Sequence, residues 1–488
     1  MAKLKLKGKE LRAIGYPESP VISLAITTME KNFKHTSHED ALDILKAILV
    51  NPTAFLEDEL LESIAKSLLE EKRKSELREK YATLSDVDLK AYLNSLTGTL
   101  FELNPKGIAF NTYGMEHIEG GALNQMHIAA KLPIAVAGAL MPDAHQGYGL
   151  PIGGVLATDN AVIPYGVGVD IGCRMCLSVF NVDAGELKNR DKFFERELSE
   201  HTLFGGGREF KQMTDHNVLD HKVFDEIPFV KGLQAKAARQ LGSSGSGNHF
   251  VEWGVVEIAS AQNALNIPPG KYVALLSHSG SRGMGASIAG HYTRIAMEKT
   301  KLPGEAKHLA WLNLNSQEGM EYWLAMNLAG DYASACHQII HKKLAKALGE
   351  KPIARVENHH NFAWKEMWNG REVIVHRKGA TPAGKGVLGI IPGSMTAPGF
   401  IVEGLGVEGA VNSASHGAGR KMSRSKAMQS ITHEAMKSEL KTHGVKLIGG
   451  GLDEAPHAYK DIHTVMNAQT ELVNIVGVFH PKIVKMDG

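Results

Sequence analysis

Residues 141–175, MPDAHQGYGLPIGGVLATDNAVIPYGVGVDIGCRM, constrain the fold more than any other segment of the chain. The segment is rich in glycine and apolar residues, yet it carries Asp143, His145, Asp170 and Cys173. Glycine permits close approaches and backbone conformations that other residues avoid, so we expect tightly folded loops here. A carboxylate and a thiol so close together, in a chain with only three cysteines, indicate a metal site and not a disulfide.

Length and charge narrow the class of protein. A chain of 488 residues is long enough for one large domain and one smaller domain. The 54 basic and 53 acidic residues nearly cancel, so binding to nucleic acid would need local basic patches. Three cysteines argue against a disulfide scaffold, and we find neither a signal-peptide pattern nor a run of about 18 apolar residues. We therefore expect a cytoplasmic protein.

The glycine content divides the chain into two parts. Residues 1–104 are poor in glycine and predict a small helical N-terminal module, whereas 105–488 predict a catalytic domain. In the module, Ser37 and Asp40 have the spacing of a capping box before a helix over 41–50. Apolar residues at helical spacing predict a second helix from Phe55 into the charged run 70–80, and a third from Ser85. The charged run is interpreted as a solvated helix face.

Residues 105–488 have a different pattern of apolar residues and glycines. Short apolar runs at 272–276, 373–375 and 386–391 predict buried strands that end in glycine-rich turns, and a long helix is predicted around 319–346. This mixture predicts an α+β fold with mixed sheets flanked by helices. The nucleotide-binding patterns GxGxxG and GxxxxGK[ST] are absent in the required contexts, which argues against Rossmann and P-loop sites.

Several histidines share one kind of setting, at the end of an apolar run and beside small residues. They are His249, His278, His360 and His416. Together with Asp170 and Cys173 they offer nitrogen, oxygen and sulfur ligands for a transition metal such as Mn, Fe or Zn. A thiolate can bridge two metals, and paired metals suit phosphoryl transfer.

Cys173 and Cys176 also form a C-x-x-C pattern, which leaves other interpretations to consider. A redox motif is disfavoured because a glycine-rich apolar loop is not the start of a thioredoxin-like helix. A zinc knuckle would need a second pair, and only Cys336 remains. We interpret Cys176 as a small buried side chain and Cys173 as a metal ligand.

Two basic loops are candidate phosphate sites. The segment 415–426, SHGAGRKMSRSK, places a histidine among small residues and cations, and histidine can attack phosphorus. The second loop is His376-Arg377-Lys378. A solvated basic surface is the alternative interpretation of each loop.

An ordered set of motifs resembles RtcB-type RNA ligases over about 105–488. The motifs are MPDAHQGYGLPIGG, VDIGC, GSGNHFVE, HSGSRG, HN at 360–361, HRKGAT, IPGSM, SHGAGRKMSR and EAPHAYKD. The resemblance implies an RtcB-like fold and a ligase that uses GTP and two Mn²⁺ ions. Such a ligase joins an RNA 3′-phosphate, or a 2′,3′-cyclic phosphate, to a 5′-hydroxyl end in tRNA splicing or RNA repair.

The same resemblance implies roles for individual residues. His416 would be the guanylylated nucleophile, oriented by Asp143. The implied metal ligands are Asp170, Cys173, His249, His278 and His360, with Cys173 bridging. The implied GTP- or GMP-binding residues are Asn248, Phe250, Glu252, Pro392, Gly393, Ser394, Met395, His416, Gly417, Ala418, Gly419, Tyr459 and Lys485. Candidates for triphosphate or RNA phosphates are Arg282, Arg377, Lys378, Arg420 and Arg424.

Some residues depart from the family's pattern. Arg174 follows Cys173 where glycine is usual, which adds bulk and charge beside the metals, and Met486-Asp487-Gly488 follow Lys485 where relatives end in Lys-Gly. Two other functions stay open at this point. One is a two-metal phosphoesterase that hydrolyses cyclic phosphates without ligation, and the other is a non-catalytic RNA-binding protein.

Overall fold

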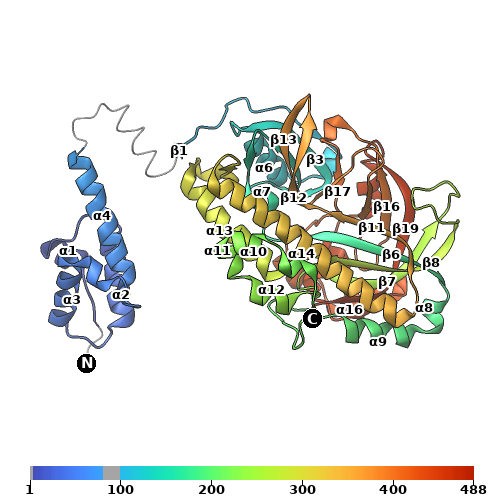
Figure 1. The fold of residues 1–488 in the computed structure, drawn as a ribbon, viewed down its shortest axis with the longest axis horizontal. Helices are drawn as coiled ribbons and strands as arrows, with labels where there is room; N and C mark the ends of the chain where they lie inside the picture. Colours follow the sequence, from blue (N-terminus) through green and yellow to red (C-terminus); the bar gives the residue numbers. More distant parts are fainter. Residues whose placement is uncertain (1–3, 81–98) are drawn as a thin grey trace. The chain divides into compact units, whose positions relative to one another are not determined.

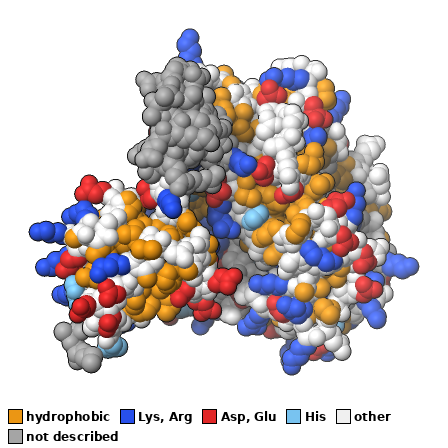
Figure 2. Space-filling view, turned by 60° about the vertical axis from the view of Figure 1, so that its left-hand side comes forward, with side chains coloured by type: hydrophobic (Ala, Val, Ile, Leu, Met, Phe, Trp, Pro, Cys, Tyr) orange, Lys and Arg blue, Asp and Glu red, His pale blue; other side chains and the backbone are white. Residues whose placement is uncertain are grey.

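The computed structural model describes residues 4–80 and 99–488. The chain divides into two compact units, Met1–Leu96 and Thr97–Gly488. Within the described residues, no helix combines the length and the apolar character needed to cross a membrane. On the face shown in Figure 2, basic and acidic side chains are interspersed, in keeping with the small net charge.

The N-terminal unit is helical (Figure 1). Its described helices are α1 (Gly8–Ala13), α2 (Val21–Asn32), α3 (His38–Val50) and α4 (Glu62–Lys80). Leu11, Met29, Leu45 and Ile64 form part of a shared core. The Ser37 hydroxyl accepts the Asp40 N–H at 3.1 Å, which confirms the predicted cap of α3.

The prediction of a second helix from Phe55 was wrong about its start. A short 3₁₀ helix covers Pro52–Phe55, and α4 begins only at Glu62. The Asp58 carboxylate accepts the N–H groups of Leu60 and Leu61 at 2.9 and 3.0 Å, and this local turn competes with helix. The third predicted helix lies outside the described residues.

Two sheets form the centre of the larger unit, and both are mixed as predicted. The eight-stranded sheet has the order β11-β6-β8-β7-β19-β16-β15, with β18 beside β19. Its strands are β11 (Pro352–His359), β6 (Arg174–Asp183), β8 (Gly270–Ser279), β7 (Phe250–Ile258), β19 (Val473–Met486), β16 (Gly399–Gly404), β15 (Leu388–Ile391) and β18 (Lys446–Ile448). The five-stranded sheet contains β12 (Asn361–Trp368), β13 (Arg371–Lys378), β4 (Ile152–Thr158), β3 (Ala135–His145) and β2 (Asn111–Thr112), in that order. The three predicted strands are confirmed as β8, β13 and β15.

Helices flank these sheets. The long helix α14 (Gln317–Leu348) confirms the predicted helix and lies across β6 and β8, next to α13 (Arg282–Lys299) (Figure 1). Its buried residues Ile340 and Leu344 pack with Phe180 of β6 and Leu275 of β8, whereas Tyr322 and Met326 pack with residues of α13. Other helices are α6 (Gly120–Ala130), α7 (Pro164–Val167), α9 (Asp191–His201), α12 (Gln234–Gln240), α15 (Arg424–Ser430), α16 (His433–His443) and α17 (Ile462–Asn467).

Candidate active site

The predicted metal ligands come from strand ends that the sheet places side by side. Cys173 directly precedes β6, His249 directly precedes β7, and His278 lies near the end of β8. In the register, His278 is paired with Met175 on one side and with Phe250 on the other. His360 joins β11 to β12, and β11 is the other neighbour of β6. Side chains that are far apart in the sequence therefore lie together at one end of these neighbouring strands.

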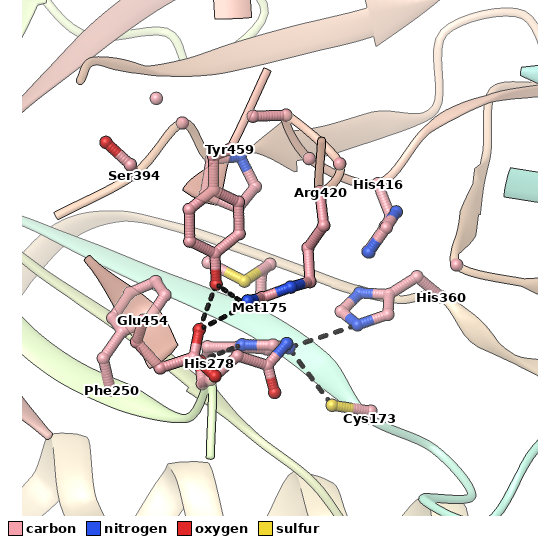
Figure 3. A pocket seen from close by; sticks show the side chains of 18 of the residues that line it. Cys173, Met175, Phe250, His278, His360, Ser394, His416, Arg420, Glu454 and Tyr459 are labelled. Atoms are coloured by element: carbon pink, nitrogen blue, oxygen red, sulfur yellow. Dashed lines mark hydrogen bonds and ion pairs between the residues drawn. The ribbon is translucent and has the colours of Figure 1, made fainter. Parts of the chain in front are cut away.

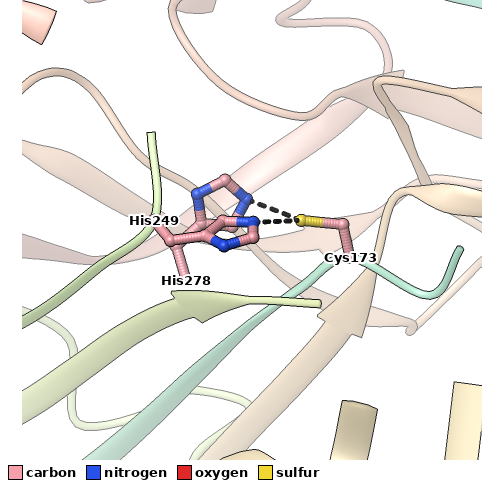
Figure 4. A group of neighbouring side chains, drawn as sticks. All are labelled: Cys173, His249 and His278. Carbon is pink, nitrogen blue, oxygen red and sulfur yellow. Dashed lines mark hydrogen bonds between the residues drawn. The ribbon is translucent and has the colours of Figure 1, made fainter. Parts of the chain in front are cut away.

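These side chains converge (Figures 3 and 4). Cys173 Sγ lies 3.1 Å from His278 Nε2 and 3.4 Å from His249 Nε2. His278 Nε2 is 3.2 Å from His360 Nε2. Asp170 Oδ2 is 2.8 Å from His249 Nε2. All five predicted ligands thus share one cluster, in which Cys173 and the three histidines are buried and Asp170 is partly exposed.

The hydrogen bonds around this cluster fit a metal. The Nδ1 atoms of His249 and His278 lie 2.9 Å from the carbonyl oxygens of Ser244 and Asn248. Because a carbonyl only accepts, these Nδ1 atoms carry the protons, and both Nε2 lone pairs point into the shared space. Burial lowers the pKa of His278 to about 3, so its imidazole is neutral. Neutral imidazoles, a carboxylate and a thiol gathered in this way suit a divalent transition metal.

His416 and Asp143 form the other half of the site. His416 follows β17 (Ser413–Ser415), and its Nδ1 lies 2.6 Å from Oδ2 of Asp143, at the end of β3. Burial alone would raise the pKa of Asp143, but the hydrogen bond and charge of His416, with Lys460 nearby, bring it below its ordinary value. The carboxylate therefore accepts Nδ1–H and leaves Nε2 of His416 free to react.

The loop after His416 is held close to Asp143. The His416 backbone N–H also donates to Asp143 Oδ2, at 3.1 Å. Gly419 has a φ of +72°, and a Cβ at this position would clash with the Asp143 carbonyl, so glycine is required there. The ring of His416 faces that of His360, with centroids 5.0 Å apart. The candidate nucleophile therefore lies beside the metal-ligand cluster.

A cavity of about 360 Å³ extends from these residues. Nearly all of the predicted GTP-binding residues line it: Asn248, Phe250, Glu252, Pro392, Gly393, Ser394, Met395, Gly417, Ala418, Gly419 and Tyr459. Burial raises the pKa of Glu252 well above its ordinary value. Burial therefore favours the uncharged form of this carboxyl. The cavity lining combines apolar side chains such as Phe250 with many polar and charged groups.

The chain matches the family model described as tRNA-splicing ligase RtcB, over residues 125–227 and 204–487. The chain belongs to the RtcB family. It is 32% identical to the RNA-splicing ligase RtcB of Escherichia coli (strain K12) over 394 residues, 74% of this chain and 92% of that protein. It is 30% identical to the tRNA-splicing ligase RtcB of Thermococcus kodakarensis over 437 residues, 74% of this chain and 89% of that protein.

Lys485 is the predicted GTP-binding residue that this RtcB chain does not bring into the cavity. Successive residues of a strand point to opposite faces, and Val484 and Met486 of β19 line the cavity. The Lys485 ammonium instead donates to the carbonyl oxygens of Leu198, Ser199 and Thr202, at the end of α9.

The predicted phosphate-binding cations take different positions. Arg420 and Arg424 line the cavity, and both contact the buried acid Glu454. Glu454 lies in the motif EAPHAYKD but was not among the predicted site residues. Glu454 also accepts the Tyr459 hydroxyl (Figure 3). Arg282 lies at the metal-ligand cluster, 3.2 Å from Nδ1 of His249. These three arginines surround the site.

Arg377 and Lys378 are neighbours on β13 with opposite surroundings. The Arg377 guanidinium is 1% exposed and makes two bonds to Glu366, at 2.5 and 3.0 Å, plus one to Ser413 at 2.7 Å. Arg377 therefore forms a structural ion pair with Glu366 and does not face the cavity as a phosphate contact would. Lys378 lines the cavity, and burial lowers its pKa to about 7.

We expect Arg377→Met to lower the free energy of unfolding by about 3 kcal/mol, because it leaves Glu366 and several buried acceptors without their hydrogen-bond donor. Lys378→Met, the matched variant one residue away, should not lower it near neutral pH, because the variant removes an amine whose burial disfavours the charged form. Chemical denaturation of both variants checks this. Equal loss in the two variants would contradict the assignment.

The stability difference between wild type and Lys378→Met should also depend on pH. In the unfolded chain this lysine titrates near 10.4, whereas in the folded protein its pKa is about 7. Between these values the unfolded state binds the extra proton, so the wild type gains stability relative to the variant as the pH rises. Denaturation at a series of pH values measures this slope, and a flat difference would mean that the folded ammonium stays charged.

Arg174, the departure beside Cys173, points away from the metal-ligand cluster. Its guanidinium lies 2.6 Å from Glu357 and 2.7 Å from the Gly330 carbonyl of α14. Alternation along β6 explains this direction, because Met175 faces the cavity and its two neighbours face α14. The expectation that Arg174 adds bulk and charge beside the metals was therefore wrong.

A second buried group, Cys176, His337 and His341, lies behind β8. All four ring nitrogens of the two histidines have hydrogen-bond partners, which are serine hydroxyls or the Ser279 carbonyl. Ser277 bridges both rings, at 2.6 Å from His337 and 2.8 Å from His341. These hydrogen bonds explain why both imidazoles are buried, and they connect α14 to β8, the strand that carries His278.

Proposed function

We propose that the protein is a GTP- and Mn²⁺-dependent RNA ligase that joins a 3′-phosphate or 2′,3′-cyclic phosphate end to a 5′-hydroxyl end, in tRNA splicing or RNA repair. Membership of a family named for tRNA-splicing ligases supports the RNA ligase activity. The observation that carries the finer proposal is His416 held by buried Asp143 beside a cluster of metal-ligating side chains.

His416 would act as the nucleophile toward GTP. Its Nε2 would attack the α-phosphorus, forming a P–N bond while the bond to pyrophosphate breaks and pyrophosphate leaves with the electron pair. Asp143 holds Nδ1–H throughout, so the imidazole presents its lone pair and the positive charge that develops on the ring is stabilised. The RNA 3′-phosphate would then displace the histidine and take up GMP. Attack of the 5′-hydroxyl on the activated 3′-phosphate would release GMP and seal the strand, and a cyclic phosphate end would first be opened by hydrolysis.

The cavity beside His416 offers a place for the guanosine. Phe250 contributes an apolar ring and Glu252 a buried hydrogen-bonding group, the two elements needed to hold and orient a purine. Gly417 and Ala418 leave room for a phosphate next to the nucleophile.

Charge neutralisation would come from both the metals and the arginines. Asp170, Cys173, His249, His278 and His360 would hold the Mn²⁺ ions. Bound there, the metals would polarise phosphate oxygens and stabilise the charge of an in-line displacement. Arg282, Arg420 and Arg424 surround the same space, so their guanidinium groups would bind phosphate oxygens.

The deciding experiment supplies RNA with a 3′-phosphate and RNA with a 5′-hydroxyl, together with GTP and Mn²⁺. The proposal predicts a sealed strand that depends on both cofactors. Opening of a cyclic phosphate without sealing would indicate a phosphoesterase instead, and RNA binding without turnover would indicate a non-catalytic protein.

A further inference from the structure

Three aromatic rings cluster beside the cavity, outside the residues described so far. Tyr148 lies in the loop between β3 and β4, Tyr165 in α7, and His308 in the 3₁₀ helix Gly304–Leu309. The centroid of the Tyr148 ring lies 6.3 Å from the ring centroids of Tyr165 and of His308. The Tyr165 and His308 centroids are 5.2 Å apart. We call Tyr148, Tyr165 and His308 the aromatic cluster.

Tyr148 is 70% exposed, yet its backbone is firmly held. The Gln125 side chain bonds both the N–H and the carbonyl of Gly147. Gly149 has a φ of +70° and packs so closely that a Cβ there would lie 3.0 Å from the His308 carbonyl oxygen. A large ring presented to solvent from a fixed loop, next to two other rings, gains little from packing and is typical of a recognition surface.

Lys378 connects the aromatic cluster to the nucleophile. Its ammonium donates to the Tyr148 carbonyl and lies 5.5 Å from the centre of the Tyr165 ring. The next residue, Gly379, lies against His416, because a Cβ there would be 3.1 Å from Cε1 of that ring. Two consecutive residues thus join the cluster to the reacting group.

The charges around the cluster favour a polyanion with flat apolar groups. Burial, with Lys307 and Lys378 nearby, lowers the pKa of His308, so its ring is neutral at pH 7. Lys307 is exposed, and Lys378 lies at the cavity wall. Neutral rings lie beside the exposed Lys307 ammonium and beside Lys378, whose charged form a bound phosphate would favour. This combination matches single-stranded nucleic acid, whose bases stack on aromatic faces while its phosphates bind cations.

We propose that the aromatic cluster stacks an unpaired nucleobase of the RNA strand, close to the end that reacts at His416. The proposal rests on the proposed RNA ligase function and names where its substrate binds. Lys378 would face the phosphate next to the stacked base, and recognition would be tolerant of sequence because every base has a stacking face.

The test compares Tyr148→Ala with Tyr148→Phe in the full-length, metal-loaded protein. The probe is a single-stranded RNA with a 3′-phosphate that carries 2-aminopurine near that end. Tyr148→Ala should weaken RNA binding by roughly 5–150-fold and reduce the quenching of the probe, whereas Tyr148→Phe keeps the ring and should bind as the wild type does. Labelling of the protein by GTP should be the same in all three proteins.

Unchanged RNA affinity in Tyr148→Ala would overturn the proposal, as would equal loss of RNA binding and GTP labelling, which would show a damaged site. If no protein is labelled by GTP and no RNA is sealed, the ligase proposal fails. Base stacking would still be supported in that case by weaker RNA binding of Tyr148→Ala alone, so the two failures are distinguishable.

Discussion

Replacing His416 with alanine should abolish the covalent labelling of the protein by α-labelled GTP in the presence of Mn²⁺. The variant lacks the only atom of this residue that could form the P–N bond, and Asp143 cannot substitute because it lies buried behind the ring. Sealing of RNA ends should fall to background with it. Gel detection of an acid-labile protein–GMP adduct measures the first step apart from the later ones.

Asp143→Asn gives this prediction a finer control. The amide can turn its NH₂ toward Nδ1 of His416, which favours the tautomer with its proton on Nε2 and blocks attack. We expect labelling to slow by roughly 10⁴-fold, the size of the effect when a similar carboxylate behind a catalytic histidine is made an amide. Both variants should retain metal and RNA binding. A labelled His416→Ala protein would mean that another residue is the nucleophile.

Cys173→Ala should remove most of the bound Mn²⁺ and all of the ligase activity. Cys173 Sγ lies within 3.4 Å of two candidate ligands, so its loss removes the donor at the centre of the cluster. Measuring the metal content after dialysis, together with the Mn²⁺ dependence of GTP labelling, tests this expectation.

Cys176→Ala is the matched control for that variant. Cys176 is equally buried and lies on the same strand region, but it points to the opposite face of β6, toward His337 and His341. We expect it to keep the metal content and lose only about 1 kcal/mol of stability from the small cavity. Loss of metal from both variants to the same degree would contradict the assignment of Cys173 as the central ligand.

The predicted site residues were found in local motifs, and most of them meet in one place in the structure. Glycine-rich turns that carry histidine, aspartate or cysteine have a chemical pattern visible in a few residues, so His249, His278 and His416 could be singled out one by one. Glu454 could not, because an acid in a motif becomes notable only when two arginines and a tyrosine are seen to contact it.

Direction along a strand was harder to predict than position. Arg377 and Lys485 each lie one residue from side chains that line the cavity, and alternation turns them to the other face. Arg174 points toward α14 for the same reason. The basic character of these residues is compatible with both a phosphate contact and a structural ion pair, and no spacing rule distinguishes the two.

The sequence by itself determined the family, the α+β class and the chemical types gathered in the site, because short motifs specify residue types and local turns. Only the tertiary structure decided which of these residues meet. Cys173 and His360 are distant in sequence, and they become neighbours through the order of β11, β6 and β8 in one sheet. That order, and the face each side chain takes, follow from long-range strand pairing and packing against α14. The glycine-rich stretch 141–175 illustrates both contributions. Its motifs identify the residue types from the sequence, whereas Asp143 and Cys173 meet their separate partners, His416 and His278, only in the folded chain.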